Sequence, residues 1–244
     1  MLSYDRPTHI PTDTTKTKVK MGQVNQTQST VDHLPINTSP SKTMANGVAQ
    51  TGNAQPAAPS RHIWLVTGPA GCGKSTIAKF LSESLKLPFL EGDEFHPKAN
   101  VEKMAAGKPL NDADRWDWLG ILREAGVREL ERDSQGVVIT CSALKRKYRD
   151  VIRVAQVYHP DVKLHFIYLH APEEVLVKRV AARENHYMGA SMVHSQFEDL
   201  EEPVPEEKDV IKVDVSGSLA EIEKEALAKA EGAVRQGLVS DASS

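Results

Sequence analysis

Residues 68–76, with the sequence GPAGCGKST, contain the residue types that bind a nucleotide polyphosphate. The segment fits the phosphate-binding loop pattern of a glycine, four residues and then Gly73, Lys74 and Ser75, in which backbone N–H groups surround the phosphates. In this pattern the lysine neutralises phosphate charge and the serine hydroxyl binds Mg²⁺. A turn rich in glycine and serine can match the same spacing by chance, so the flanking sequence decides between the two interpretations.

The sequence on either side of the loop favours phosphate binding. The apolar run 62–67 is typical of a buried strand, and 74–85 places apolar residues along one face of a helix. A strand, a loop and a helix in this order form an anion site at the helix N-terminus. Cys72 is interpreted as a small loop residue rather than a redox centre. The predicted nucleotide contacts in the loop are Gly68, Pro69, Ala70, Gly71, Cys72, Gly73, Lys74, Ser75 and Thr76.

Beyond the loop, strand and helix patterns alternate along the chain. This alternation predicts an α/β fold with a doubly wound parallel sheet, whose ligands bind at the C-terminal ends of the strands. The further strand patterns are 87–93, 136–141, 164–170 and 209–215, and the helical patterns are 98–106, about 112–132, 145–156, 173–184 and a last one from 219.

Two carboxylates end the second predicted strand. Glu91 and Asp93 are two residues apart, so we expect both side chains on the same side of the strand. Beside a bound nucleotide and Mg²⁺, one carboxylate can act in the metal shell and the other as a base for a hydroxyl proton. Gly92 and Pro97 would also suit a solvated turn, and only the upstream loop favours the functional interpretation.

Arg115 lies in the first turn of a predicted helix. Asn111 or Asp112 is expected to cap this helix, which accounts for the nearby acids. An arginine is unfavourable beside a helix N-terminus unless an anion is bound there, so Arg115 predicts a carboxylate contact. The two tryptophans, Trp116 and Trp118, are interpreted as core residues.

Other basic residues follow the third and fourth predicted strands. Lys145 and Arg149 come after the third strand, where they form either part of a site or a solvated helix face. Arg179 and Arg183 are one helical turn apart, so both can reach one polyphosphate. An exposed helix face explains this pair equally well on spacing alone.

The composition of the first 60 residues differs from the rest. Residues 1–60 are rich in Thr, Ser, Asn, Gln, Pro and Ala, which predicts a disordered tail before a domain at 61–240. The tail lacks the apolar core of a secretory signal, and its few arginines and several acids argue against mitochondrial import.

Composition also narrows the classes of partner. No apolar run approaches the roughly 20 residues that span a bilayer, so we expect a soluble protein without a membrane partner. Two cysteines and nine histidines show neither a disulfide framework nor zinc spacing, which favours a reducing, cytoplasmic location. A net charge of −3 and a pI of about 6.3 argue against nucleic acid and favour a small-molecule substrate.

Five segments of the chain form a recognisable set in this order: GPAGCGKST, EGDEFHPKANVEKMAAGKPLNDADRWDWL, CSALKRKYRD, ARENHYM and SQFEDLEEP. Together they resemble the gluconate kinases of the shikimate-kinase-like group of P-loop kinases. The resemblance covers about residues 61–235 and implies a five-stranded parallel sheet sandwiched by helices, with a mobile lid. It also implies ATP-dependent phosphorylation of D-gluconate at its 6-hydroxyl, giving 6-phospho-D-gluconate and ADP and feeding the pentose phosphate pathway.

The resemblance further implies roles for single residues, with ATP and Mg²⁺ as cofactors. Asn185, His186 and Tyr187 stand where the family usually has Gly-His-Phe, which puts the lid hinge in question. The implied catalytic residues are Lys74, Asp93 and Arg183, and the implied metal ligands are Ser75 and Glu91. The implied substrate contacts are Asp93, His96, Arg115, Lys145 and Arg149, and Arg179 and Arg183 join the loop in binding the nucleotide.

Other functions fit parts of the sequence. Within kinases, shikimate or a nucleoside monophosphate is an alternative acceptor. From a different class, a nucleotide-dependent switch would also use the loop, although no N-K-x-D sequence selects guanine here. Small P-loop kinases often pair, and the sequence leaves open whether this chain forms a homodimer.

Overall fold

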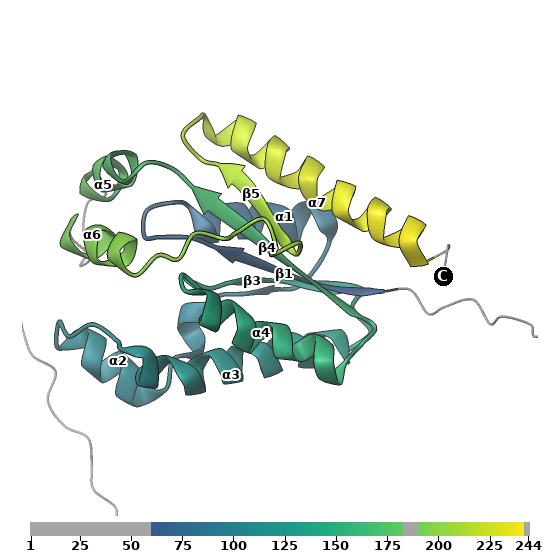
Figure 1. Cartoon of the computed structure of the whole chain (residues 1–244), viewed down its shortest axis with the longest axis horizontal. Helices are drawn as coiled ribbons and strands as arrows, with labels where there is room; N and C mark the ends of the chain where they lie inside the picture. Colours follow the sequence, from purple (N-terminus) through teal and green to yellow (C-terminus); the bar gives the residue numbers. More distant parts are fainter. Residues whose placement is uncertain (1–59, 183–189, 242–244) are drawn as a thin grey trace, which may run out of the picture. The chain divides into compact units, whose positions relative to one another are not determined.

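The computed structural model describes residues 60–182 and 190–241, which form a parallel sheet with helices on both faces (Figure 1). The strands are β1 (Arg61–Thr67), β2 (Phe89–Leu90), β3 (Gly136–Thr140), β4 (Val162–His170) and β5 (Val210–Asp214). The helices are α1 (Lys74–Leu85), α2 (Lys98–Ala105), α3 (Asp112–Leu130), α4 (Arg146–Tyr158), α5 (Glu173–Ala181), α6 (Ala190–Glu198) and α7 (Leu219–Asp241), and a 3₁₀ turn spans Gly92–Phe95.

The sheet confirms the predicted five-stranded parallel architecture. Its strand order is β2-β3-β1-β4-β5, and every pairing is parallel. β1 is central, so that Leu65 pairs with Ile139 on one side and Phe166 on the other. The loop that follows β1 therefore leaves the middle of the C-terminal edge, where sheets of this type bind ligands.

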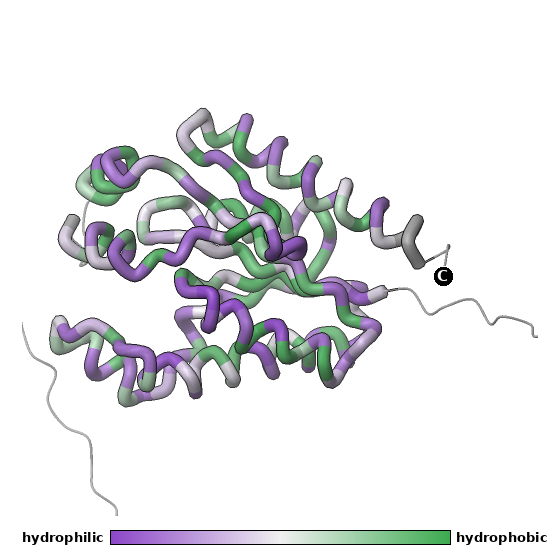
Figure 2. Tube along the Cα trace, in the orientation of Figure 1, coloured by the Kyte–Doolittle hydropathy of each residue, from purple (hydrophilic) through white to green (hydrophobic). Residues whose placement is uncertain are grey.

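Alternate residues of β1 supply the two halves of the core. Ile63 and Leu65 join the cluster packed under α3 and α4, whereas Trp64 and Val66 join the cluster under α1 and α7. The period of two along a strand explains this division. Figure 2 shows the same pattern, with hydrophobic residues gathered along the central strands and hydrophilic ones interspersed along the outer helices.

The start of α3 is fixed by its cap. The Asn111 side chain accepts from the Asp114 N–H (3.1 Å), and the Asp114 carboxylate accepts from the Asn111 N–H (2.7 Å). This reciprocal pair is a capping box, so Asn111 is the N-cap. Trp118 is buried as predicted, but Trp116 is 40 % exposed, and its prediction as a core residue is wrong.

The second strand is shorter than predicted and ends before the two carboxylates. A Cβ on Gly92 would lie 1.9 Å from the Thr140 carbonyl oxygen, so only glycine allows the chain to pass the end of β3 here. The Gly92 N–H donates to Thr140 Oγ1 (2.9 Å), and its carbonyl accepts from the Trp118 indole (2.8 Å). These bonds hold a 3₁₀ turn in place of a strand, so Glu91 and Asp93 do not share one side of a strand as expected.

Among residues 60–182 and 190–241, the structure has no helix that is both long and apolar enough to cross a membrane. Most of the tail predicted at 1–60 lies outside the described residues, as do Arg183 and the predicted hinge residues Asn185, His186 and Tyr187.

Candidate active site

The phosphate-binding loop connects β1 to α1 in the shape that its glycines permit. Gly68, Gly71 and Gly73 have φ angles of 143°, 82° and 93°, which other residues rarely adopt. Gly71 also packs closely on α5, because a Cβ there would lie 2.7 Å from Val180 Cγ2. The positive φ angles of its glycines therefore set the shape of the loop, and Gly71 packs it against α5.

The N-terminus of α1 is prepared for an anion. In the described structure, Gly73 caps α1 without a side-chain hydrogen bond, and no acidic residue lies in the first turn. The first N–H groups thus face outward with the positive end of the helix dipole. Lys74 Nζ donates to the carbonyl oxygens of Gly68 (2.9 Å) and Pro69 (3.1 Å), and Ser75 in the first turn is exposed.

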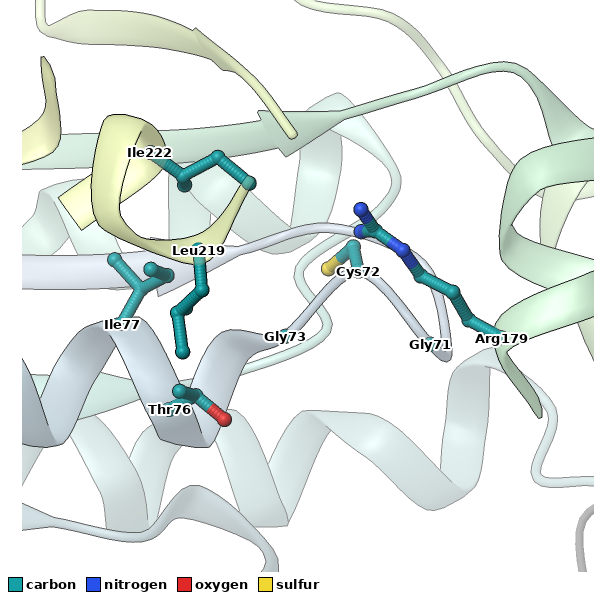
Figure 3. A pocket seen from close by; sticks show the side chains of 8 residues that line it. All are labelled: Gly71, Cys72, Gly73, Thr76, Ile77, Arg179, Leu219 and Ile222. Atoms are coloured by element: carbon teal, nitrogen blue, oxygen red, sulfur yellow. The ribbon is translucent and has the colours of Figure 1, made fainter. Parts of the chain in front are cut away.

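A cavity of about 260 Å³ lies beside the loop (Figure 3). Arg179 reaches over it from α5 and donates to the Val215 carbonyl oxygen (2.5 Å). Leu219 and Ile222 of α7 form its apolar wall, and the helical pattern from 219 did not indicate that this helix reaches the cavity. Apolar side chains and a guanidinium plane suit a flat aromatic ring. The cavity is lined by Gly71, Cys72, Gly73, Thr76, Ile77, Arg179, Leu219 and Ile222.

The two cysteines are buried thiols. Burial raises the pKa of the Cys72 thiol, which agrees with a packing role in the loop rather than redox chemistry. Burial also raises the pKa of the Cys141 thiol to about 12. Among the smaller influences on the pKa of this thiol, the charge of Asp93 raises it and the charges of Arg115 and Lys74 lower it.

Glu91 and Asp93 have different surroundings. One Glu91 carboxylate oxygen accepts from Thr140 Oγ1 at the end of β3, which fixes the side chain near the loop. The Asp93 side chain is 77 % exposed, and its Oδ1 lies 3.9 Å from His96 Nε2. Asp93 is thus the carboxylate that an incoming hydroxyl can reach.

His96 and Arg115 complete this side of the site. The His96 ring stacks on Trp118 with centroids 4.0 Å apart, and burial lowers the pKa of His96, which favours the neutral imidazole. The Arg115 guanidinium lies 5.6 Å from the Tyr148 ring centroid. Within the described residues, no carboxylate forms a salt bridge with Arg115, which leaves its positive charge for an external anion.

Lys145 lies at a second cavity, of about 400 Å³, between the start of α3 and the start of α4. Its ammonium is 2.7 Å from Asp199 Oδ1 and 3.6 Å from Asp112 Oδ1. Hydrogen bonds from Lys147 and Tyr148 lower the pKa of the Asp112 carboxyl to about 2. Lys145 is therefore near the acceptor side, but two carboxylates already neutralise it. Asp199 lies in the segment SQFEDLEEP, but the predicted site did not include it, because its pairing with Lys145, 54 residues away, depends on the fold.

Arg149 does not occupy the predicted position. It is 1 % exposed, and its Nε and Nη2 donate to Glu207 at 2.8 and 2.7 Å. Its Nη1 donates to the carbonyl oxygens of Leu144 and Glu201, both at 3.1 Å. Because every guanidinium nitrogen has an internal partner, this geometry contradicts the prediction that Arg149 contacts the acceptor.

Comparisons with known proteins agree with a phosphate-binding loop that serves a kinase. A family model described as an AAA domain matches residues 63–203. A probable gluconokinase of Schizosaccharomyces pombe is 51% identical over 170 residues, which cover 69% of this chain and 88% of the relative. The thermoresistant gluconokinase of Escherichia coli is 41% identical over 158 residues, which cover 65% of this chain and 87% of the relative.

A solved structure agrees as well. The crystal structure of a gluconokinase from Sinorhizobium meliloti is 39% identical and has a TM-score of 0.64, covering 75% of this chain and 97% of that chain. With a phosphate-binding loop at the centre of its sheet and relatives matched over most of their length, the chain belongs to the gluconokinase family of P-loop kinases.

Proposed function

We propose that this chain transfers the γ-phosphoryl group of ATP to the 6-hydroxyl of D-gluconate, giving 6-phospho-D-gluconate and ADP for the pentose phosphate pathway. The observation that carries the proposal is that Lys74 follows the C-terminal end of β1, while Asp93 follows Gly92, which is hydrogen-bonded to Thr140 at the same end of the neighbouring strand β3. The names of the relatives supply the choice of gluconate.

The nucleotide half of the site supports ATP as the donor. The loop and the N-terminus of α1 present N–H groups and Lys74 to the polyphosphate. The cavity under Arg179 accommodates the base. Ser75 and Glu91 supply a hydroxyl and a carboxylate oxygen, which are donors that suit Mg²⁺ together with phosphate oxygens. Mg²⁺ bound there would neutralise charge on the phosphates.

The acceptor half supports a small acid. Arg115 can bind a carboxylate in a bidentate manner, and Lys145, whose charge Asp199 and Asp112 offset, lines a cavity nearby as a hydrogen-bond donor. The neutral His96 imidazole can donate to or accept from a sugar hydroxyl. The site therefore suits a polyhydroxy acid whose carboxylate lies near Arg115 and Lys145 and whose hydroxyls point towards His96 and Asp93.

The chemical step needs a base and charge neutralisation. Asp93 accepts the proton of the 6-hydroxyl while the oxygen forms a bond to the γ-phosphorus and the bond to the β-phosphate oxygen breaks. ADP leaves with the electron pair of the broken bond. Lys74 offsets charge on the transferring group, and Arg179 and Arg183 are proposed to assist.

A panel of acceptors tests the substrate. The purified full chain is mixed with ATP, Mg²⁺ and one of D-gluconate, shikimate or a nucleoside monophosphate, and ADP release is followed. We expect multiple turnovers with gluconate alone. Turnover with shikimate or a nucleoside monophosphate would show that this compound, and not gluconate, is the acceptor. Binding of ATP without turnover on any acceptor would favour a nucleotide-dependent switch.

The variant Asp93→Asn tests the proposed base. It keeps the shape and the hydrogen-bonding reach but removes the basic oxygen, so kcat should fall by at least about 10²-fold while ATP binding survives. Glu94→Gln is the matched control, because Glu94 is an exposed acid of the same 3₁₀ turn. A kcat for Asp93→Asn within about threefold of the parent, in a folded protein, would move the base elsewhere.

A further inference from the structure

One side chain outside the phosphate-binding loop is hydrogen-bonded to it. The Ala70 N–H donates to Gln196 Oε1 at 2.7 Å, across 126 positions of the chain. In the part of the chain that the structure describes, the other side chain bonded to the loop backbone is Lys74, which meets carbonyl oxygens. Gln196 is thus the external acceptor for a loop N–H.

The loop needs such a contact because its own hydrogen bonds are few. Its glycines with positive φ place little restriction on the backbone. The one internal turn bond, from the Cys72 N–H to the Pro69 carbonyl oxygen, is long at 3.4 Å. Packing against Val180 limits how far Gly71 can move, but it does not orient a peptide plane. The Pro69 carbonyl oxygen, which lies on the same peptide plane as the Ala70 N–H, accepts from Lys74 Nζ and from the Cys72 N–H. The directional hydrogen bond to Gln196 holds the opposite, N–H side of this plane.

Gln196 is carried by a helix that is itself held firmly. Val193 of α6 is 0 % exposed and joins the core cluster under α1 and α7. His194 Nδ1 lies 2.9 Å from Glu173 Oε1, which ties α6 to α5. A side chain on a helix fixed at two points positions its partner more accurately than one on a loop.

We infer that Gln196 is a positioning residue for the nucleotide: it holds the Ala70 peptide so that the following loop N–H groups already point at the phosphates. The inference rests on the proposed use of ATP, not on the identity of the acceptor. Without this bond, Lys74 and Cys72 hold the Pro69–Ala70 peptide only on its carbonyl side until ATP binds. If ATP binding must also order the backbone of one residue, the affinity for ATP falls by about 5- to 30-fold. Gln196 prevents this loss because it orders the residue before ATP binds.

The first test is Gln196→Met in the full chain, with ATP titrated directly in the absence of an acceptor. Methionine keeps the length of the side chain but lacks the oxygen. We expect Kd for ATP to rise by about 5- to 30-fold, with an unchanged KM for the acceptor and a similar melting temperature. Gln156→Met is the matched control, because Gln156 lies on α4, away from the loop, and the change removes its hydrogen bond to the Val162 carbonyl oxygen at the start of β4.

The second variant, Gln196→Glu, keeps an acceptor oxygen and adds a charge. The ratio of its Kd for ATP to that of the parent should shrink as salt rises, since salt screens the repulsion, whereas the ratio for Gln196→Met should stay constant. If Gln196→Met does not fold, the salt dependence of Gln196→Glu alone tests the inference. A Kd for Gln196→Met within twofold of the parent, or a Gln196→Glu ratio that stays raised at high salt, would overturn the inference. If gluconate is not the acceptor, the ATP titration still tests the inference, because it is carried out without an acceptor.

Discussion

Glu207→Gln should strongly destabilise the folded protein, because Glu207 is the centre of a buried ion-pair network. Its carboxylate accepts from Arg149 at 2.8 and 2.7 Å, from Arg153 Nη2 at 2.6 Å and from the Val204 N–H at 3.2 Å. Both Glu207 and Arg149 have side chains that are only 2 % exposed. Glutamine keeps the shape of the side chain but leaves the Arg149 charge buried without a counter-ion.

Two estimates of the magnitude agree. Breaking a buried ion pair by removing one partner costs about 3 to 5 kcal/mol. Independently, burial would raise the pKa of Glu207, but hydrogen bonds from Arg149 and Arg153 outweigh it and lower the pKa to about 2 from 4.5. That difference corresponds to about 3 kcal/mol at neutral pH. For a chain of this size, such a loss lowers Tm by roughly 6 to 20 °C.

Urea unfolding followed by circular dichroism measures the effect at pH 7. The control is Glu206→Gln, an exposed neighbour in the same segment, which should stay within about 0.5 kcal/mol of the parent. The parent should also lose this contribution as pH falls from about 4.5 towards 2, since a lowered folded-state pKa stabilises only above the unfolded value. The Glu207→Gln variant should lack that part of the acid slope.

A double variant separates the charge from the packing. Arg149→Met with Glu207→Leu removes both charges and retains apolar volume, so it should be more stable than Glu207→Gln alone. A loss below about 1 kcal/mol for Glu207→Gln would refute the network. It would also reopen the prediction that Arg149 is available to the acceptor.

Two further predictions concern the acceptor cation and the acid sensitivity of the fold. Arg115→Ala should raise KM for gluconate strongly and leave the affinity for ATP nearly unchanged, since losing a bidentate charged contact costs about 2 to 4 kcal/mol; equal weakening for both substrates in steady-state kinetics would place Arg115 elsewhere. Burial and the neighbouring His62 lower the pKa of His165 to about 4 from 6.5. As the pH falls from 6.5 to 4, the unfolded chain binds a proton at His165 before the folded chain does, so the free energy of unfolding should fall by up to about 3 kcal/mol. His165→Phe keeps the stacking on Trp64 and should flatten that part of the curve, and an unchanged slope in pH-dependent urea unfolding would contradict the assignment.

The fold was predictable because its signals are local. An apolar run before Gly68 and a helical face after Ser75 predict a strand, a loop and a helix without knowledge of distant residues. The second strand was predicted too long for a non-local reason. Alternation through 87–93 suits a strand, but Thr140 and Trp118 bind the backbone at Gly92 and hold it in a turn.

The site was less predictable wherever long-range pairing decides a role. Lys145 and Arg149 are both basic and close in sequence, yet Glu207, 58 positions after Arg149, holds it inside the protein. Lys145 remains at a cavity, but Asp199 neutralises it from the end of another helix. Of the three predicted acceptor cations, Lys145 and Arg149 have carboxylate partners, whereas Arg115 has none among the described residues, and only the fold shows this difference.

Helix α6 connects the two halves of the site. Gln196 accepts from the Ala70 N–H on the nucleotide side, and Asp199, three residues later, binds Lys145 on the acceptor side. Val193 is buried in the core, so the segment moves as one body or not at all. We predict that an acid bound at Lys145 displaces Asp199. Titrating ATP with and without the acid measures whether this displacement reaches Gln196, one helical turn away. Because coupling between two ligands is reciprocal, any factor by which the acid changes the affinity for ATP must equal the factor by which ATP changes the affinity for the acid.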